Sequence, residues 1–579
     1  MTPIAAATFL LLAATPAPRT PEEAIRGILE RADAPWASVG DVRRSLGAFY
    51  AARGHHPAWL SDGRPTSQAR VVAAILASAA AKGLDPDDYD GSRWFGELVR
   101  LAGGAASPAD QATFDVGLTA SVLRYATHLR RGRVDPRRLG FELGTARRAV
   151  RLPVLAAELA AAEDPAAALA ALEPRIAGYR RLLEGLARHR DLAAILGDRA
   201  VVTPPRVAPR PGKRYAGAGG VAWRLLAFGD LPASELAAAE EGVFTEGLAA
   251  AVARFQARHG LATDGRIGPR TAAALNVPLS RRVRQIEVTL ERWRWMPHGI
   301  APPLLVVNIP QFRLVAFEGD AASMRRALTM DVIVGDEFPA RRTPVFARRM
   351  SHVVFSPYWE VPNGLLEREL LPRWRRDPGY FDEHGFFVET AEGPRPVTGE
   401  TLAEVFAGRA RVRQPPGPGN ALGGAKFAFP NEFAVYLHDT PDRRLFSRAD
   451  RALSNGCVRV SDAAGLAEWL LRGKPGWDRP RIERAMAAEE PEVVRLEEGP
   501  WVFIVYGTAY ADPDGVMHFL PDVYGHDAAL ERALARASRR PRSPLTRRAA
   551  ARCPRARSRR RRRTRPLLAR ARWPRRAAP

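Results

Sequence analysis

Cys457 is one of two cysteines in the 579-residue chain, and it lies in the run Ser454-Asn455-Gly456-Cys457-Val458-Arg459. The preceding glycine allows a tight turn and would leave the amides of Gly456 and Cys457 facing a developing oxyanion. His438 lies nineteen residues upstream, at the end of an apolar run, where a strand could present a base to a cleft. A thiol beside an imidazole is the minimum for nucleophilic catalysis, because the imidazole can take the thiol proton. The alternative is a buried cysteine and an unrelated histidine at a strand end.

The second half of the chain has the pattern of a β-rich domain that would position these two residues. Short β-branched or aromatic runs between turns predict strands at residues 304–309, 314–317, 331–334, 352–355 and 501–506. Residues 364–433 carry helical signals instead, and an insertion of this length in a β domain is often a lid over a site. We therefore expect a β-rich domain at residues 302–530 with a helical, lid-like insertion at about 364–433.

The first half of the chain has helical periodicity. Residues 21–213 are predominantly helical by pattern and end in a proline-rich connection. Residues 218–277 form a separate compact unit, in which one apolar stripe of a helix is made by Phe244, Leu248, Val252 and Phe255. The predicted fold class is therefore multidomain α+β.

The net charge of +24 raises nucleic acid as a partner, but its distribution argues against that interpretation. Residues 536–579 hold nineteen Arg and no Asp or Glu, which leaves a net charge of +5 on the rest of the chain. The composition of this segment is typical of a disordered tail, suited to anionic polymers or lipid headgroups, or else of residues past the true stop. No nucleotide-binding or metal-binding motif occurs, so we expect no cofactor and no metal.

The amino terminus carries a short apolar segment at residues 3–14. Twelve residues are too few to span a bilayer as a helix, and small residues follow at 13–17. This pattern predicts a signal peptide at residues 1–17 and an exported protein, although the segment lacks the usual preceding Lys or Arg. Membrane anchoring is expected only if this leader stays uncleaved.

The spacing around the cysteine resembles the signature of L,D-transpeptidases with a YkuD-type catalytic domain. Fifteen residues separate His438 from Ser454, and Gly456, Cys457 and Arg459 follow in the order of that signature. Four further blocks resemble the large, multidomain branch of the family: they are residues 291–297, residues 414–431, the run HHPAWL with Trp59, and the run GLDPDDYD with Tyr89. Residues 218–277 resemble the peptidoglycan-binding repeat. The resemblance covers about residues 28–530.

The resemblance implies a helical scaffold domain at 21–213, a three-helix peptidoglycan-binding module at 218–277 and a catalytic domain at 302–530. It also implies a reaction. Cys457 would attack the carbonyl of the L,D bond in a peptidoglycan tetrapeptide stem, releasing D-Ala and leaving an acyl-thioester. The side-chain amine of a second stem would then attack, forming a 3→3 cross-link.

The resemblance also implies roles for single residues. His438 would be the base, without the second histidine that smaller members have where this chain has Asn455. The backbone carbonyl or the carboxylate of Asp439 would orient the His438 ring, and sequence does not choose between them. Oxyanion contacts would come from Gly456, and substrate contacts from Arg459, Ser454, Asn455 and Tyr436, although a bracing ion pair is the alternative for Arg459.

The partners implied are peptidoglycan stem peptides and glycan, in the periplasm or cell envelope. Other cell-wall synthesis enzymes are candidate partners, and nucleic acid is not expected. Two alternatives stay open. One is a thiol hydrolase of the same fold, acting as an L,D-carboxypeptidase or releasing a protein from the wall. The other is a non-catalytic wall-binding protein.

Overall fold

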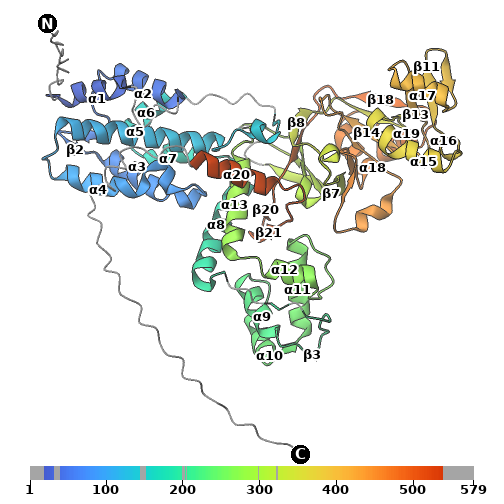
Figure 1. Cartoon of the computed structure of the whole chain (residues 1–579), viewed down its shortest axis with the longest axis horizontal. Coiled ribbons are helices and arrows are strands. Elements are labelled where there is room, and N and C mark those ends of the chain that lie inside the picture. The colour runs from blue at the N-terminus through green and yellow to red at the C-terminus, as the bar shows by residue number, and fades with distance from the viewer. Residues whose placement is uncertain are drawn as a thin grey trace, which may run out of the picture.

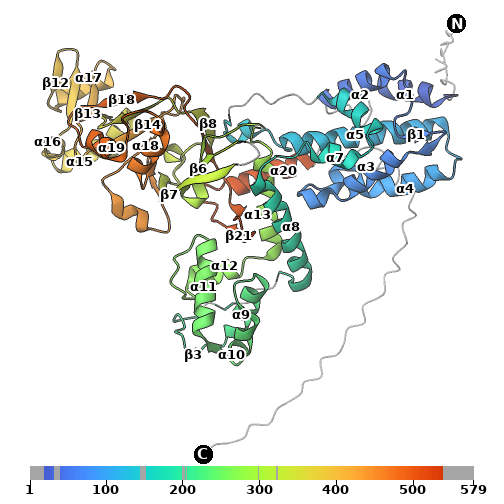
Figure 2. The same cartoon turned by 180° about the vertical axis from the view of Figure 1, so that it is seen from behind.

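The protein is built from a helical N-terminal part, a β-rich C-terminal part and a small helical body that projects between them (Figures 1 and 2). The structure, a computed structural model, describes residues 18–31, 40–143, 151–198, 202–203, 205–297, 299–320 and 324–538. The predicted signal peptide at residues 1–17 lies outside the described residues. The predicted multidomain α+β fold class is confirmed.

The N-terminal part is a helical bundle around one long helix. Its helices are α1 (Pro21–Glu30), α2 (Gly40–Ala52), α3 (Ser67–Ala77), α4 (Gly91–Ala102), α5 (Pro108–Arg131), α6 (Leu152–Ala161) and α7 (Pro165–Ala170). Ser107 caps the start of α5 by accepting a hydrogen bond from the Asp110 amide, and Pro108 occupies its first turn. Helix α5 is buried along most of its length, and the other helices cover it. This bundle has a hydrophobic core of its own.

Two long helices, α8 (Ala177–Leu196) and α13 (Leu279–Trp293), pack side by side and connect the parts (Figure 1). The small helical body lies in the chain between them and contains α9 (Ala218–Ala227), α10 (Leu236–Glu240), α11 (Glu246–Arg258) and α12 (Pro269–Leu275). The predicted apolar stripe is fully buried in its core. Phe244, however, belongs to the short strand β4 (Val243–Phe244) rather than to the helix. The short α10 adds a fourth helix to the three expected.

A β-hairpin of the C-terminal part, β20 (Ala509–Ala511) and β21 (Met517–Phe519), packs on this helix pair. Side chains of three helices donate hydrogen bonds to carbonyl groups of this hairpin and of the residue just before it. Arg258 of α11 donates to the Met517 carbonyl (3.1 Å), Arg188 of α8 donates to the Gly515 carbonyl, and Gln285 of α13 donates to the Thr508 carbonyl (2.9 Å). The small helical body is therefore held against the C-terminal part as well as connected to it.

The C-terminal part is organised around one eleven-stranded sheet in the order β18-β9-β14-β15-β17-β7-β6-β5-β19-β8, with β16 paired to β7. The strands are β5 (Leu304–Asn308), β6 (Arg313–Glu318), β7 (Arg325–Gly335), β8 (Phe346–Arg349), β9 (His352–Phe355), β14 (Ala425–Ala428), β15 (Leu437–His438), β16 (Ala452–Ser454), β17 (Val458–Val460), β18 (Glu492–Arg495) and β19 (Trp501–Val505). All five predicted strands are present. Helices α18 (Ala463–Leu471) and α19 (Arg479–Met486) complete its core.

The insertion is a mixed α/β subdomain, whereas a helical one was expected. Its four-stranded sheet contains β10 (Trp359–Glu360), β11 (Phe387–Thr390), β12 (Gly393–Arg395) and β13 (Arg411–Gln414). Helices α14 (Asn363–Leu365), α15 (Leu371–Arg376), α16 (Tyr380–Glu383) and α17 (Gly399–Phe406), with a π-helical turn at Leu366–Leu370, cover it around a separate core. The chain enters this sheet at Trp359 and is back in the main sheet by Ala425, so its limits differ from the expected 364–433. Strands this short contain too few residues for a period of two to stand out.

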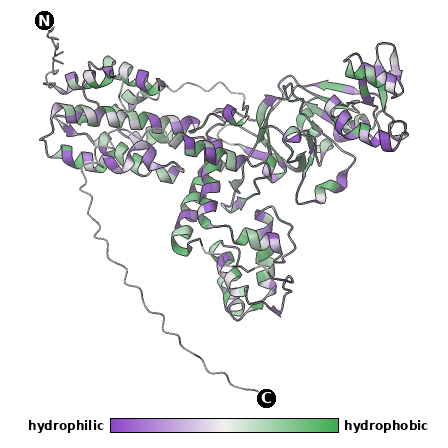
Figure 3. Ribbon diagram, in the orientation of Figure 1, coloured by the Kyte–Doolittle hydropathy of each residue, from purple (hydrophilic) through white to green (hydrophobic). Residues whose placement is uncertain are grey.

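The chain's last described element is α20 (His526–Ser538), whose Leu530 and Leu534 pack into the core of the C-terminal part. Arg536 lies in this helix, so the tail does not begin at residue 536 as expected, and residues 539–579 lie outside the described part. Apolar and polar residues are mixed along the helices (Figure 3). Among the described residues, no helix has the length and apolarity needed to cross a membrane.

Candidate active site

Three neighbouring strands at the centre of the main sheet bring the predicted site residues together. Lys426 of β14 lies directly opposite His438 of β15, and His438 lies opposite Arg459 of β17. Residues paired in this way project from the same face of a sheet. The intervening residues Phe427, Leu437 and Val458 are buried in the core on the other face. The sheet therefore places Lys426, His438 and Arg459 in a row on one face.

Cys457 and Tyr436 join this row through the same alternation. Cys457 lies two residues before Arg459, and Tyr436 lies two residues before His438. The Val458 amide donates to the Tyr436 carbonyl (3.1 Å), which fixes the two strand ends against each other. The rings of Tyr436 and His438 are 5.7 Å apart in an edge-to-face arrangement. The cysteine and the histidine, nineteen residues apart in sequence, thus belong to one site.

The loop before Cys457 is held by two buried hydroxyl groups. Ser454 Oγ donates to the Cys457 carbonyl (2.6 Å) and accepts from the Gly456 amide (3.1 Å). Thr343 Oγ1 donates to the Gly456 carbonyl (2.8 Å). Gly456 has a φ of +119°, which only glycine adopts readily. The Gly456 amide, predicted to contact the oxyanion, is thus occupied within the loop, and the Cys457 amide becomes the better candidate.

His438 is oriented by a backbone carbonyl. Its Nδ1 donates to the carbonyl oxygen of Asp439, the next residue, over 2.6 Å. The Asp439 carboxylate accepts instead from the Gly424 amide (3.0 Å) and from Arg443 (2.8 Å). Of the two arrangements that the sequence left open for Asp439, the structure has the one through the carbonyl.

The cysteine and histidine are both neutral at rest. Burial lowers the pKa of His438 to about 3, with a further contribution from the charge of Arg459, although backbone hydrogen bonds of Asp439 and Leu422 oppose the shift. Burial raises the pKa of the Cys457 thiol, against hydrogen bonds from Tyr436 and the charges of Lys426 and Arg459. Both shifts favour the uncharged forms at neutral pH, a protonated thiol and an unprotonated imidazole.

Arg459 is partly available for a ligand. Its side chain is 21% exposed, and its Nη1 is 3.8 Å from Asp442 Oδ2, a loose ion pair. Its buried Nε has no hydrogen-bond partner within the described part of the chain. Asn455 is an exposed residue of the loop, whereas the Ser454 hydroxyl donates one hydrogen bond and accepts one within it.

The insertion reaches the loop before Cys457 (residues 454–456), called the nucleophile loop below after the role proposed for Cys457, through an ion pair. Glu369, in its π-helical turn, lies 3.4 Å from Arg341 Nη2, and Arg341 Nη1 binds Asp336 (3.0 Å). The Asp336 amide in turn donates to the Ser454 carbonyl (2.9 Å). A hydrogen bond from the Trp359 side chain opposes the burial that raises the pKa of Tyr436. The insertion thus contacts the site from two directions.

Three residues of the site escaped sequence reasoning as functional candidates. Thr343 lies more than a hundred residues before the loop it holds, so no local pattern marks it. Asn420 was part of a quoted motif, and its side chain binds the Pro357 and Pro415 carbonyls and the Leu422 amide, which fixes the chain beside His438. Lys426 was also quoted only as part of a motif.

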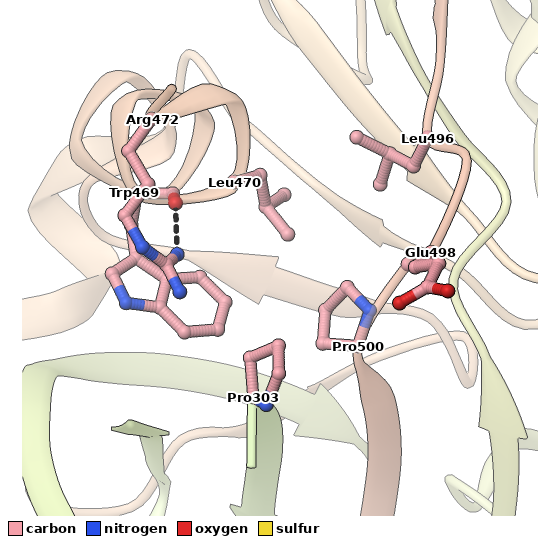
Figure 4. Close-up of a pocket in the computed structure, with 8 residues that line it drawn as sticks. Pro303, Trp469, Leu470, Arg472, Leu496, Glu498 and Pro500 are labelled. Carbon is pink, nitrogen blue, oxygen red and sulfur yellow. Dashed lines mark hydrogen bonds between the residues drawn. The ribbon is translucent and has the colours of Figure 1, made fainter. Parts of the chain in front are cut away.

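A cavity of about 210 Å³ lies elsewhere in the C-terminal part, between the end of α18 and the start of β19 (Figure 4). It is lined by Pro303, Trp469, Leu470, Arg472, Leu496, Glu498, Gly499 and Pro500. None of the predicted site residues lines it.

Comparisons with known families divide the chain in the same way. Residues 302–477 match the L,D-transpeptidase catalytic domain, residues 222–275 match a family described as "Putative peptidoglycan binding domain", and residues 44–186 match the scaffold domain. The catalytic-domain match includes all the predicted site residues.

Two individual proteins are similar to the chain. A protein of Haemophilus influenzae described as "Putative L,D-transpeptidase" is 37% identical over 234 residues. These residues are 40% of this chain and 45% of that protein, so the chain matches less than half the length of this relative. A fused Zn-dependent amidase/peptidase with a peptidoglycan-binding domain from Clostridium acetobutylicum is 11% identical and covers 52% of this chain and 100% of its own. Its TM-score of 0.14 carries no argument. Residues 302–477 are therefore a YkuD-type L,D-transpeptidase catalytic domain, and a scaffold domain and a peptidoglycan-binding domain precede it in the chain.

Proposed function

We propose that the protein is a cysteine-dependent L,D-transpeptidase that forms 3→3 cross-links in peptidoglycan from tetrapeptide donor stems. The single observation that carries this proposal is that Cys457, His438 and Arg459 lie on one face of the sheet. Beside them, hydrogen bonds of Ser454 hold the loop in which Gly456 has a positive φ. We further propose that the protein is exported and works in the periplasm or cell envelope, where peptidoglycan is found.

In the first half-reaction, Cys457 attacks the carbonyl of the L,D bond while His438 takes the thiol proton. The new C–S bond forms an oxyanion, which the Cys457 amide stabilises. The C–N bond to the terminal D-Ala then breaks, and the imidazolium of His438 protonates the departing amine. An acyl-thioester and a neutral imidazole remain.

In the second half-reaction, a side-chain amine of another stem attacks the thioester and gives its proton to His438. The C–S bond breaks, and the thiolate takes the proton back from the imidazolium. Arg459 holds a stem carboxylate, because its guanidinium has only a loose partner in Asp442. Asn455, exposed beside the loop, and Tyr436, beside the thiol, contact the bound peptide.

The proposal is tested by incubating the purified protein with disaccharide-tetrapeptides and identifying the products by mass. A cross-linked dimer that has lost one D-Ala supports it. Tripeptide monomer alone would instead identify an L,D-carboxypeptidase, and no product at all would favour a wall-binding protein. Cys457→Ala should abolish turnover, and Cys553→Ser, which changes the only other thiol, should leave it unchanged.

A further inference from the structure

Lys426 is unusual in this chain because it is a lysine. The chain has 87 basic residues, of which four are lysines. Lys82 pairs with Glu173 (2.7 Å), and Lys213 and Lys474 are exposed. Lys426 instead lies half-buried on β14, at the centre of the main sheet. An ammonium is a compact point charge on a flexible stem, which a guanidinium cannot reproduce in a confined site.

The main anionic group that the positive charge of Lys426 can stabilise is the Cys457 thiolate. Its Nζ lies 4.3 Å from the centre of the Tyr436 ring, a cation–π contact. Among the described residues, no carboxylate comes within ion-pair distance of it. Burial lowers the pKa of Lys426, and the charges of Cys457 and, more weakly, of Glu360 oppose that shift. The thiolate of Cys457 is therefore its strongest anionic neighbour.

Arg459, the other cation of the site, is placed differently. It faces Asp442 at 3.8 Å, and the charge of Glu369 also acts on it. Its charge is thus shared with fixed carboxylates, or with a ligand carboxylate that replaces them. Tyr436 and His438 are the other titratable groups beside the thiol among the described residues, and the thiol itself donates to the Ala434 carbonyl (3.8 Å). His352 lies on β9, the strand that pairs with the strand of Lys426. Burial lowers the pKa of His352 most, and the charge of Lys426 lowers it further.

We propose that Lys426 is a positioning residue for the nucleophile: its ammonium stabilises the Cys457 thiolate and holds the Tyr436 ring beside the sulfur. This inference rests on the proposed function, because it takes Cys457 as the nucleophile. The same charge also helps to keep His438 neutral at rest. Lys426 thus favours the thiolate in both half-reactions, as the attacking group in the first and as the leaving group in the second.

The first test uses the scarcity of lysine. Protein labelled with ¹³C at lysine Cε gives four signals, which can be followed through a pH titration in wild type and in Cys457→Ser. We expect the pKa of Lys426 to fall by about one unit when the thiolate is removed. The exposed Lys474 serves as an internal control, and its signal should not change. A Lys426 titration that is identical in the two proteins would overturn the proposal.

The second test measures the thiol. In a Cys553→Ser background, Lys426→Gln should raise the pKa of Cys457 by about one unit in the pH profile of iodoacetamide alkylation. The rate at pH 7 should fall severalfold, because higher nucleophilicity offsets part of the tenfold loss of thiolate. Lys426→Arg should restore the wild-type pKa of Cys457 only in part, because a guanidinium cannot reproduce the compact ammonium in this confined site, and Lys474→Gln should change nothing. An unchanged profile in a folded Lys426→Gln protein contradicts the proposal, and if that variant does not fold, the wild-type titration decides.

Neither test needs peptidoglycan, so the two proposals can fail separately. A coupled lysine and thiol in a protein that forms no cross-link would refute the proposed function and keep this inference. Cross-linking by a protein whose lysine and thiol titrate independently would do the reverse.

Discussion

The Nδ1 atom of His438 lies 2.6 Å from the backbone carbonyl oxygen of Asp439, so residue 439 orients the base through its main chain. This hydrogen bond places the proton of the neutral ring on Nδ1 and leaves Nε2 unprotonated, and in the proposed mechanism it is Nε2 that would take the proton of the thiol. The Asp439 carboxylate has a separate, structural role in binding Gly424 and Arg443. The two functions of this residue can therefore be separated by mutation.

Asp439→Asn should keep the carbonyl and lose the charge. We expect cross-linking to fall less than tenfold and the free energy of unfolding to fall by about 1–2 kcal/mol, because the bond with Arg443 weakens. His438→Gln should lower kcat by about 10²–10⁴-fold, since the base is lost. Dimer formation and urea unfolding measure these effects. An Asp439→Asn protein that is folded but as inactive as His438→Gln would show that the carboxylate takes part in the reaction.

Ser454→Ala should disturb the nucleophile loop without changing its charges. The substitution leaves the Gly456 amide and the Cys457 carbonyl without their partner, at a cost of about 1–3 kcal/mol for the buried groups. We expect lower stability and a lower kcat, with the pKa of the thiol unchanged in the alkylation profile. Ser447→Ala removes an exposed hydroxyl that binds the Arg444 carbonyl and is the matched control. Equal effects of the two substitutions would exclude a specific role for Ser454.

Glu369→Gln should loosen the insertion from the nucleophile loop. The ion pair with Arg341 is only partly buried, so its loss is worth about 0.5–1 kcal/mol. Hydrogen exchange of residues 366–376 should then rise by about two- to fivefold. Glu367→Gln changes an exposed residue of the same π-helical turn and should leave exchange unchanged. If exchange rises equally in both variants, the ion pair does not hold the insertion.

Buried histidines should make the fold sensitive to acid. Burial lowers the pKa of His438 to about 3 and that of His189 and His526 to about 4, and it lowers the pKa of His128 and His259 as well. The unfolded chain binds these protons near pH 6.5, so stability is fully present above that pH and is lost as the pH falls from about 6.5 to about 4. Each such histidine contributes up to about 1.4 kcal/mol per pH unit.

Urea midpoints measured from pH 7.5 to pH 4.5 would check this dependence. His189→Gln should flatten the slope, whereas His384→Gln, which changes an exposed histidine, should not. A midpoint that stays constant down to pH 4.5 would contradict the prediction.

The sequence predicted the parts of the site that local patterns encode. A histidine at the end of an apolar run and a cysteine after a glycine indicated a strand end and a turn, and both are present. The pairing of β15 with β17, which joins them, follows from the sheet and not from either segment. Only the three-dimensional positions of the His438 ring and of Arg443 show that the Asp439 carbonyl, rather than its carboxylate, orients the ring.

The insertion and the supports of the loop were beyond the reach of sequence patterns. Four strands of two to four residues carry too little periodicity to be separated from the helices around them. The hydrogen bond of Thr343 to Gly456 joins segments that meet only after the main sheet has formed. Contacts of this kind depend on tertiary structure alone.

The hairpin formed by β20 and β21 is gripped by Arg188 of α8, Arg258 of α11 and Gln285 of α13. A module tethered only by a linker would move over a range set by that linker. The small helical body is also held to the hairpin through Arg258, and the hairpin is held to the helix pair through Arg188 and Gln285. A glycan strand bound to the small helical body would therefore present its peptides to Cys457 over a narrower range of positions than a linker alone would allow. We therefore expect the choice of stems that the protein joins to depend on their spacing along the glycan.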